Sequence, residues 1–85
     1  GGNDPYLQTK YAQDKIKATL ESAGATIEDV VRTRLFVTNI DDWEAIGKAH
    51  QEVFGTIKPC TTMVEVSRLI DKKYLVEIEA TAIMG

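Results

Sequence analysis

The chain has 85 residues and a formal net charge of −3, which suits one small domain spanning residues 1–85. Its one cysteine, Cys60, provides no disulfide framework within the chain, and no apolar run approaches the roughly 20 residues that cross a bilayer. Basic residues are scattered, which argues against nucleic acid as a partner. We therefore expect a cytoplasmic protein that has no membrane partner.

Two helices are predicted from their capping residues and their apolar stripes. The first begins at Asp4-Pro5, a cap followed by a proline at the first helical position, and ends at Gly24. The second begins after a cap at Asn39 or Asp41 and ends at Gly55. The expected apolar stripes are Ala12, Ile16, Thr19, Leu20 and Ala23 in the first helix, and Trp43, Ile46, His50, Val53 and Phe54 in the second.

Three strands are predicted from runs in which apolar and polar residues alternate. They span residues 30–38, 61–68 and 74–83, and a short capped turn at residues 26–29 leads into the first. The order of elements is then helix, strand, helix, strand, strand. This order predicts an α+β fold in which the two helices cover one face of the sheet.

Alternation assigns the strand residues to two faces. The expected apolar face carries Val31, Thr33, Leu35, Val37, Thr62, Val64, Val66, Val76, Ile78, Ala80 and Ala82. The expected second face carries Arg32, Arg34, Glu65, Glu77 and Glu79 together with Phe36, Thr61, Met63 and Leu75. Because this second face mixes charges with large apolar groups, we expect it to be covered by further copies of the chain and to hold the functional site.

Three segments, residues 30–37, 59–69 and 76–80, resemble the Rid family, which is also called the YjgF or L-PSP endoribonuclease family. The resemblance implies a chorismate-mutase-like fold, a homotrimer, and small metabolites bound in clefts between subunits. Family members begin with a further hairpin and strand, so the resemblance implies a domain that is short at its N-terminus. The best-known activity is hydrolysis of enamines and imines, made by pyridoxal-phosphate enzymes, to keto acids and ammonia.

The resemblance also implies roles for particular residues. Glu77 matches the glutamate that orients the hydrolytic water, and Met63 matches a cysteine that lines the cleft. Thr61 stands where deaminating members carry the arginine that clamps the substrate carboxylate, and threonine offers a hydroxyl without a charge. We expect Thr61, Thr62, Met63 and Arg34 to contact the substrate. Arg32 and Arg34 are the candidates to replace the missing cation, and the alternative is that neighbouring carboxylates neutralise them at a trimer interface.

Other interpretations of these residues remain open. Glu77 is also explained as a surface carboxylate paired with Arg32 or Arg34, and His50 as a core residue of the second helix. No second histidine or cysteine stands at ligand spacing, so neither a metal nor a cofactor is expected. The alternative to a divergent enamine or imine hydrolase is a non-catalytic, small-molecule-binding or regulatory trimer. Ribonuclease activity is disfavoured, because the sequence has no basic stripe and no histidine pair.

Overall fold

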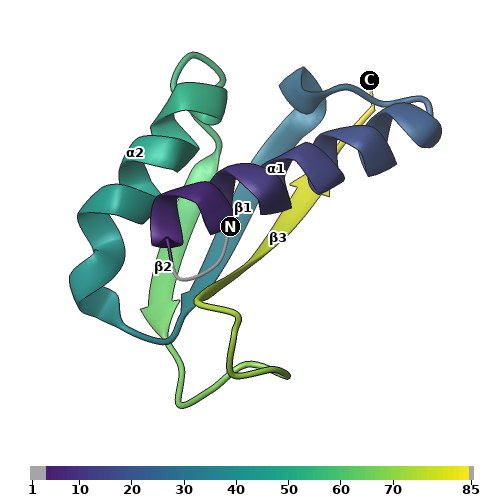
Figure 1. Ribbon diagram of the computed structural model, residues 1–85. Helices are drawn as coiled ribbons and strands as arrows, with labels where there is room; N and C mark the ends of the chain where they lie inside the picture. Colours follow the sequence, from purple (N-terminus) through teal and green to yellow (C-terminus); the bar gives the residue numbers. More distant parts are fainter. Residues whose placement is uncertain (1–3, 85) are drawn as a thin grey trace.

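The computed structural model describes residues 4–84 as two helices packed on one face of a three-stranded sheet (Figure 1). In chain order the elements are α1 (Pro5–Ser22), the 3₁₀ turn η1 (Ile27–Asp29), β1 (Val30–Val37), η2 (Ile40–Asp42), α2 (Trp43–Phe54), β2 (Cys60–Glu65) and β3 (Val76–Ala82). This order confirms the predicted α+β arrangement. In the part of the chain that the structure describes, no helix has the length and hydropathy needed to cross a membrane.

Helix α1 begins and ends as its sequence predicts. The Asp4 carboxylate accepts hydrogen bonds from the backbone N–H groups of Tyr6 and Leu7, at 2.9 and 3.1 Å. Gly24 follows the helix with φ of 86°, a conformation that glycine adopts without a steric penalty. The predicted apolar stripe is wrong in detail: Thr19 and Ala23 are exposed, while the fully buried residues of α1 are Thr9 and Gln13.

The stripe of α2 is correct for Ile46 and Phe54, which are fully buried. Trp43, the first residue of the helix, is an exception with 57% of its surface exposed. The predicted cap at Asn39 belongs to the preceding turn η2, where its side chain accepts from the Asp41 N–H at 3.0 Å. The helix itself starts after Asp42, whose side chain makes no capping bond.

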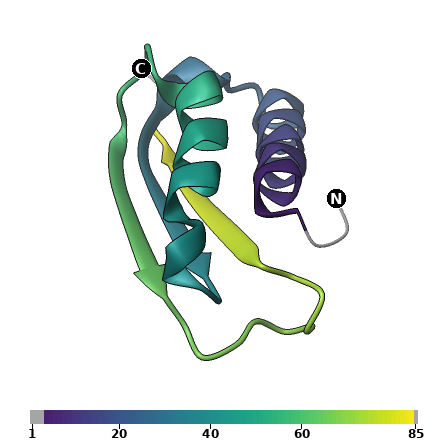
Figure 2. The same ribbon diagram turned by 60° about the vertical axis from the view of Figure 1, so that its left-hand side comes forward.

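The sheet has the order β2-β1-β3, so β1 lies in the middle. β1 and β2 are parallel because α2 carries the chain back between them, whereas β3 runs antiparallel to β1. Both helices lie on the same side of the sheet in the two views (Figure 2). β2 ends at Glu65 and β3 begins at Val76, so both strands are shorter than predicted and residues 66–75 form a connection.

The core lies between the helices and this covered face of the sheet. Leu35, Val37, Ile46 and Val76 form its centre, and Met63 and Ile78 pack against it. Val31 was predicted to share this face, but it is 45% exposed. The register shifts between Val30 and Arg32, so that Val30 turns inward in its place.

The predicted faces of β2 are also wrong. The parallel register pairs Thr33 with Thr61 and Leu35 with Met63, and paired residues point to the same side of a sheet. Thr61, Met63 and Glu65 therefore belong to the helix-covered face, while Thr62 and Val64 belong to the uncovered face. The Glu65 carboxylate confirms this placement, because it accepts from the backbone N–H of Ile40, next to α2, at 2.9 Å.

Candidate functional site

The five residues expected at the site fall on two opposite faces of the sheet. Arg34, Thr62 and Glu77 lie on the uncovered face, because Arg34 pairs with Thr62, and Glu77 pairs with Phe36 of the same β1 face. Thr61 and Met63 lie on the helix-covered face. Strand β1 separates β2 from β3, so Thr61 and Glu77 of one chain do not line a single cleft.

On the uncovered face, Arg34 is already engaged. Its Nε lies 3.1 Å from a carboxylate oxygen of Glu79, its direct partner across the strands. Arg32 donates to the Thr81 hydroxyl at 3.5 Å. Glu77 is exposed and, within residues 4–84, its carboxylate has no ion-pair partner. The expected cross-strand pair therefore forms with Glu79, and Glu77 keeps its carboxylate available for other contacts.

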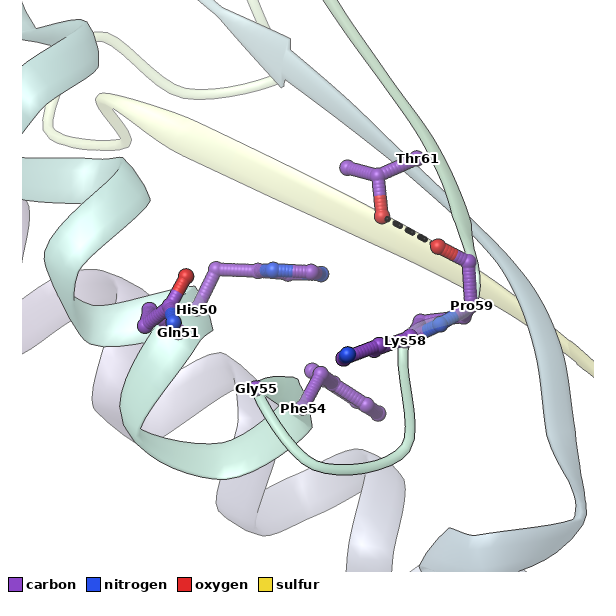
Figure 3. Close-up of a pocket in the computed structure, with 7 residues that line it drawn as sticks. All are labelled: His50, Gln51, Phe54, Gly55, Lys58, Pro59 and Thr61. Atoms are coloured by element: carbon purple, nitrogen blue, oxygen red, sulfur yellow. Dashed lines mark hydrogen bonds between the residues drawn. The ribbon is translucent and has the colours of Figure 1, made fainter.

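On the helix-covered side, a hollow of about 170 Å³ opens between the end of α2 and the start of β2 (Figure 3). Its walls are formed by His50, Gln51, Phe54, Gly55, Lys58, Pro59 and Thr61. The His50 side chain extends from α2 toward Thr61 (Figure 3). Met63 does not line this hollow, since it packs against the core. Of the five residues expected at the site, Thr61 is therefore the one that lines this hollow.

A chain of three hydrogen bonds connects α2 to β2 at this hollow. The His50 Nε2 lies 2.9 Å from the Thr33 hydroxyl, which lies 3.0 Å from the Thr61 hydroxyl. Thr61 in turn donates to the Pro59 carbonyl at 3.2 Å. Because a carbonyl only accepts, each hydroxyl must donate toward Pro59, and His50 must donate through Nε2–H to Thr33. The chain thus fixes both the orientation and the tautomer of His50.

His50 was interpreted from the sequence as a core residue. The structure supports that interpretation only in part, because the residue is half-buried. Burial lowers the pKa of His50 below its ordinary value of 6.5. Its ring packs against Phe54, with centroids 4.7 Å apart. Within residues 4–84 its Nδ1 has no hydrogen-bond partner. His50 is therefore a neutral imidazole at pH 7 with one nitrogen free to take up a proton.

Sequence reasoning did not predict that Lys58 lines this hollow or that Thr33 belongs to its hydrogen-bond chain. Lys58 lines the hollow, and Thr33 is fully buried beneath it. A signal for Lys58 was present in its position directly before Pro59-Cys60-Thr61, the segment that holds the expected carboxylate-binding position. Thr33 had no such signal, because a threonine inside a strand is common and its partners come from two other elements.

The sequence profile of one family, described as endoribonuclease L-PSP, matches residues 1–84. The chain belongs to this family. A crystal structure from Mycobacterium tuberculosis, a member of the YjgF/YER057c/UK114 family, superimposes with a TM-score of 0.96 and 49% identity, covering 99% of this chain and 71% of that one. Membership of the Rid or YjgF family, and the fold that the resemblance implied, are thus confirmed.

Two curated relatives illustrate the range of the family. An uncharacterized protein of Streptomyces coelicolor is 39% identical over all 85 residues, which correspond to 63% of its own length. The 2-iminobutanoate/2-iminopropanoate deaminase of Escherichia coli is 32% identical over 83 residues, which cover 94% of this chain and 64% of that protein. The structure of Escherichia coli TdcF with bound serine has a TM-score of 0.84 and 26% identity, covering 93% of this chain and 65% of that one. The chain therefore spans less than two thirds of the length of these two curated relatives.

Proposed function

We propose that this Rid-family chain assembles as a homotrimer that binds a small metabolite in clefts between its subunits and hydrolyses an imine or enamine there. The observation that carries the proposal is the uncovered face of the sheet. It combines the apolar side chains of Phe36 and Val64 with the unpaired carboxylate of Glu77. A face that mixes large apolar groups with charged ones, among them a free carboxylate, suits both a subunit contact and a site beside it.

The opposed positions of Thr61 and Glu77 favour a site that is shared between copies. One copy would contribute Glu77, Thr62 and Arg34 from its uncovered face. The neighbouring copy would contribute Thr61 from the rim of its hollow. Each cleft would then need two chains, so that assembly and activity would depend on each other.

The chemistry assigned to Glu77 is general base catalysis. Its carboxylate would accept a proton from a water molecule while the water oxygen bonds to the imine carbon. The imine nitrogen takes up a proton to give a carbinolamine, and its amino group takes up a second one. The hydroxyl then loses its proton as the carbon–nitrogen bond breaks, so that ammonia leaves and the carbon becomes the carbonyl of a 2-oxo acid. The deaminase name of the Escherichia coli relative and the serine bound to TdcF support a substrate derived from an amino acid.

A non-catalytic, small-molecule-binding trimer is the second candidate, and a specific observation favours it. Thr61 brings no positive charge to the position where the family resemblance implies an arginine. The loss of such a clamp weakens binding of charged substrates by several kcal/mol, about a hundredfold or more in rate. Ribonuclease activity has no comparable support, since Arg34 is neutralised by Glu79 on the face where a phosphate backbone would lie.

The test is a coupled assay in which a dehydratase produces 2-aminoacrylate from serine and the formation of pyruvate is followed. We expect slow turnover by the chain and at least a hundredfold less by Glu77→Gln. The control is Glu21→Gln, an exposed change of equal charge on α1. Sedimentation equilibrium at micromolar concentration should give three chains per particle.

The possible results separate the two candidates. Binding of a small acid without turnover would support the non-catalytic binding trimer and rule out the hydrolase. A stable monomer would contradict the shared cleft, and unchanged activity in Glu77→Gln would remove Glu77 from the reaction.

A further inference from the structure

The Thr61 hydroxyl can accept a hydrogen bond from a ligand but is not free to donate one. Its proton goes to the Pro59 carbonyl (Figure 3), and one of its two lone pairs accepts from Thr33. The second lone pair has no partner within residues 4–84. Because Thr61 is exposed, a ligand in the hollow can reach this lone pair.

His50 presents the same polarity to the hollow. Its Nε2–H is donated to Thr33, and its Nδ1 has no partner in the part of the chain that the structure describes. Burial lowers the pKa of His50, so this nitrogen carries a lone pair at neutral pH. Two acceptors, one from α2 and one from β2, therefore border the hollow. A carboxylate also accepts only, so it would meet lone pairs at both.

The turn that closes the hollow adds no free backbone donor. The N–H of Gly55 is donated to the Gln51 carbonyl and the N–H of Lys58 to the Phe54 carbonyl, each at 2.8 Å. Pro59 has no N–H to offer. Anion sites commonly use a row of backbone N–H groups aimed at the ligand. The N–H groups of this turn are instead used within the turn itself.

Lys58 carries the one fixed charge among the residues that line the hollow. Its ammonium group donates and cannot accept, and the residue is exposed on the turn before β2. An exposed ammonium selects only weakly for an anion, because water and salt screen its charge. It disfavours a ligand with a positive charge of its own. The lining thus combines acceptors on His50 and Thr61 with a donor on Lys58.

We infer that this hollow takes the primary carboxamide of a neutral substrate, with Thr61 and His50 accepting from its N–H groups and Lys58 donating to its carbonyl oxygen. A primary amide is uncharged and combines two N–H donors with an acceptor, so it complements this lining. The inference rests on the proposed function and narrows it to imines or enamines derived from amino-acid amides. Thr61 is then the residue that sets specificity, because it offers an acceptor where an arginine would offer donors. The hollow has space for an amide of the size of pyruvamide.

The charged groups of the neighbouring elements are engaged elsewhere or face away from His50. Lys10 of α1 pairs with Glu52 of α2 at 3.3 Å, Glu65 of β2 accepts from the Ile40 N–H, and Arg32, Arg34, Cys60, Glu77 and Glu79 lie on the uncovered face. On α1, the side chain that contacts the α2 residue before His50 is the neutral Gln13. Among the described residues, Lys58 is the charged group that shares the hollow with His50.

The chain has a single histidine, so its imidazole proton resonances can be assigned without ambiguity. We would titrate His50 by proton NMR in the free chain and with saturating pyruvamide or methyl pyruvate, a neutral ester without a donor. A ligand that donates to Nδ1 binds only the neutral imidazole, so pyruvamide should lower the pKa of His50 further. The expected decrease is about half a unit, which corresponds to roughly threefold weaker binding to the protonated form. Methyl pyruvate should leave the pKa unchanged.

Calorimetry at neutral pH compares the same two ligands with pyruvate. Pyruvamide should bind roughly 3- to 10-fold more tightly than either, the gain typical of one additional hydrogen bond. Thr61→Val keeps the shape and removes the acceptor, so pyruvamide should lose its advantage while methyl pyruvate binds as before. Thr19→Val is the control, since it removes an exposed hydroxyl that is bonded within α1.

Two variants of His50 separate its hydrogen bonds from its protonation. His50→Gln retains a donor for Thr33 and an acceptor for the ligand, so pyruvamide should still bind and its affinity should no longer fall at low pH. His50→Leu removes both groups and should bind pyruvamide no better than methyl pyruvate. Urea unfolding of each variant establishes that folded proteins are compared.

Each outcome decides between the claims. If pyruvate binds more tightly than pyruvamide, or if bound pyruvamide does not lower the pKa of His50, the inference is wrong while the proposed function stands. If Thr61→Val behaves like Thr19→Val, Thr61 does not contact the amide and the inference is again wrong. If none of the three ligands binds, the inference is wrong, and the absence of 2-aminoacrylate turnover would then overturn the proposed function as well.

Discussion

Thr61 and Glu77 lie on opposite faces of the same sheet, with strand β1 between the strands that carry them. Thr61 reaches the helix side, where its hydroxyl contacts Thr33 at 3.0 Å. Glu77 pairs in register with Phe36 on the uncovered side. A side chain introduced at position 61 therefore meets the groups of the hollow and not the Glu77 carboxylate of its own chain.

A first prediction concerns Thr61→Arg. The guanidinium would add a cation beside Lys58, so the affinity for pyruvate should increase by roughly tenfold, a gain typical of a charge-assisted contact. Calorimetry with pyruvate measures the change. Glu77 of the same chain faces away, but the proposed shared cleft brings Glu77 of a neighbouring copy to Thr61. The double variant with Glu77→Gln should therefore show a larger gain than Thr61→Arg alone, and equal gains would contradict the shared cleft. A gain that appears only in the double variant would mean that the new arginine reaches a Glu77 carboxylate, as it would across a subunit contact.

The hydroxyl of Thr33 should stabilise the fold through its two partners. Thr33→Val keeps the shape but leaves the Nε2–H of His50 without its acceptor and Thr61 without its donor. We expect the free energy of unfolding to fall by about 1–2 kcal/mol, measured by urea denaturation. Thr62→Val on the uncovered face is the matched control and should change stability by less than about 0.5 kcal/mol. Equal effects of the two variants would show that the hydrogen-bond chain contributes nothing to stability.

Stability should depend on pH through His50. The folded protein holds the pKa of His50 below 6.5, so the unfolded chain binds a proton at a higher pH than the folded chain does. The unfolded state then carries more bound protons in this window, and the free energy of unfolding must decrease as pH falls below about 6.5. Urea midpoints between pH 8 and pH 5 measure the decrease. His50→Gln should lose this part of the slope, and an unchanged slope would contradict the assignment.

Gln13 offers a test of a buried polar group between the helices. Its amide nitrogen donates to the Ala49 carbonyl at 3.1 Å, whereas its buried Oε1 has no partner within residues 4–84. Gln13→Met retains the volume and removes the unsatisfied oxygen, so stability should stay the same or rise by about 1 kcal/mol. Gln13→Glu should lose more than about 2 kcal/mol at pH 7, because a carboxylate would be buried without a cation. Both values follow from urea unfolding curves.

Several features of this protein are determined locally and were predictable from the sequence alone. Asp4 and Gly24 fix the ends of α1 because a cap and a left-handed turn depend on neighbouring residues only. The alternating runs located three strands, and the segments around residues 59–69 and 76–80 identified the family. The sequence likewise shows directly that position 61 holds a threonine and not an arginine.

The arrangement of these parts was decided by tertiary structure. Alternation with a period of two separates the residues of β2 into two sets, but it does not say which set faces the helices. The more apolar set of Thr62, Val64 and Val66 was assigned to the core, whereas the parallel register with β1 turned Thr61 and Met63 inward. That register depends on where α2 returns the chain to the sheet. It is therefore set by contacts between residues that are distant in the sequence. The same packing brings His50, Thr33 and Thr61 together from three different elements, and this proximity leaves no trace in the local sequence.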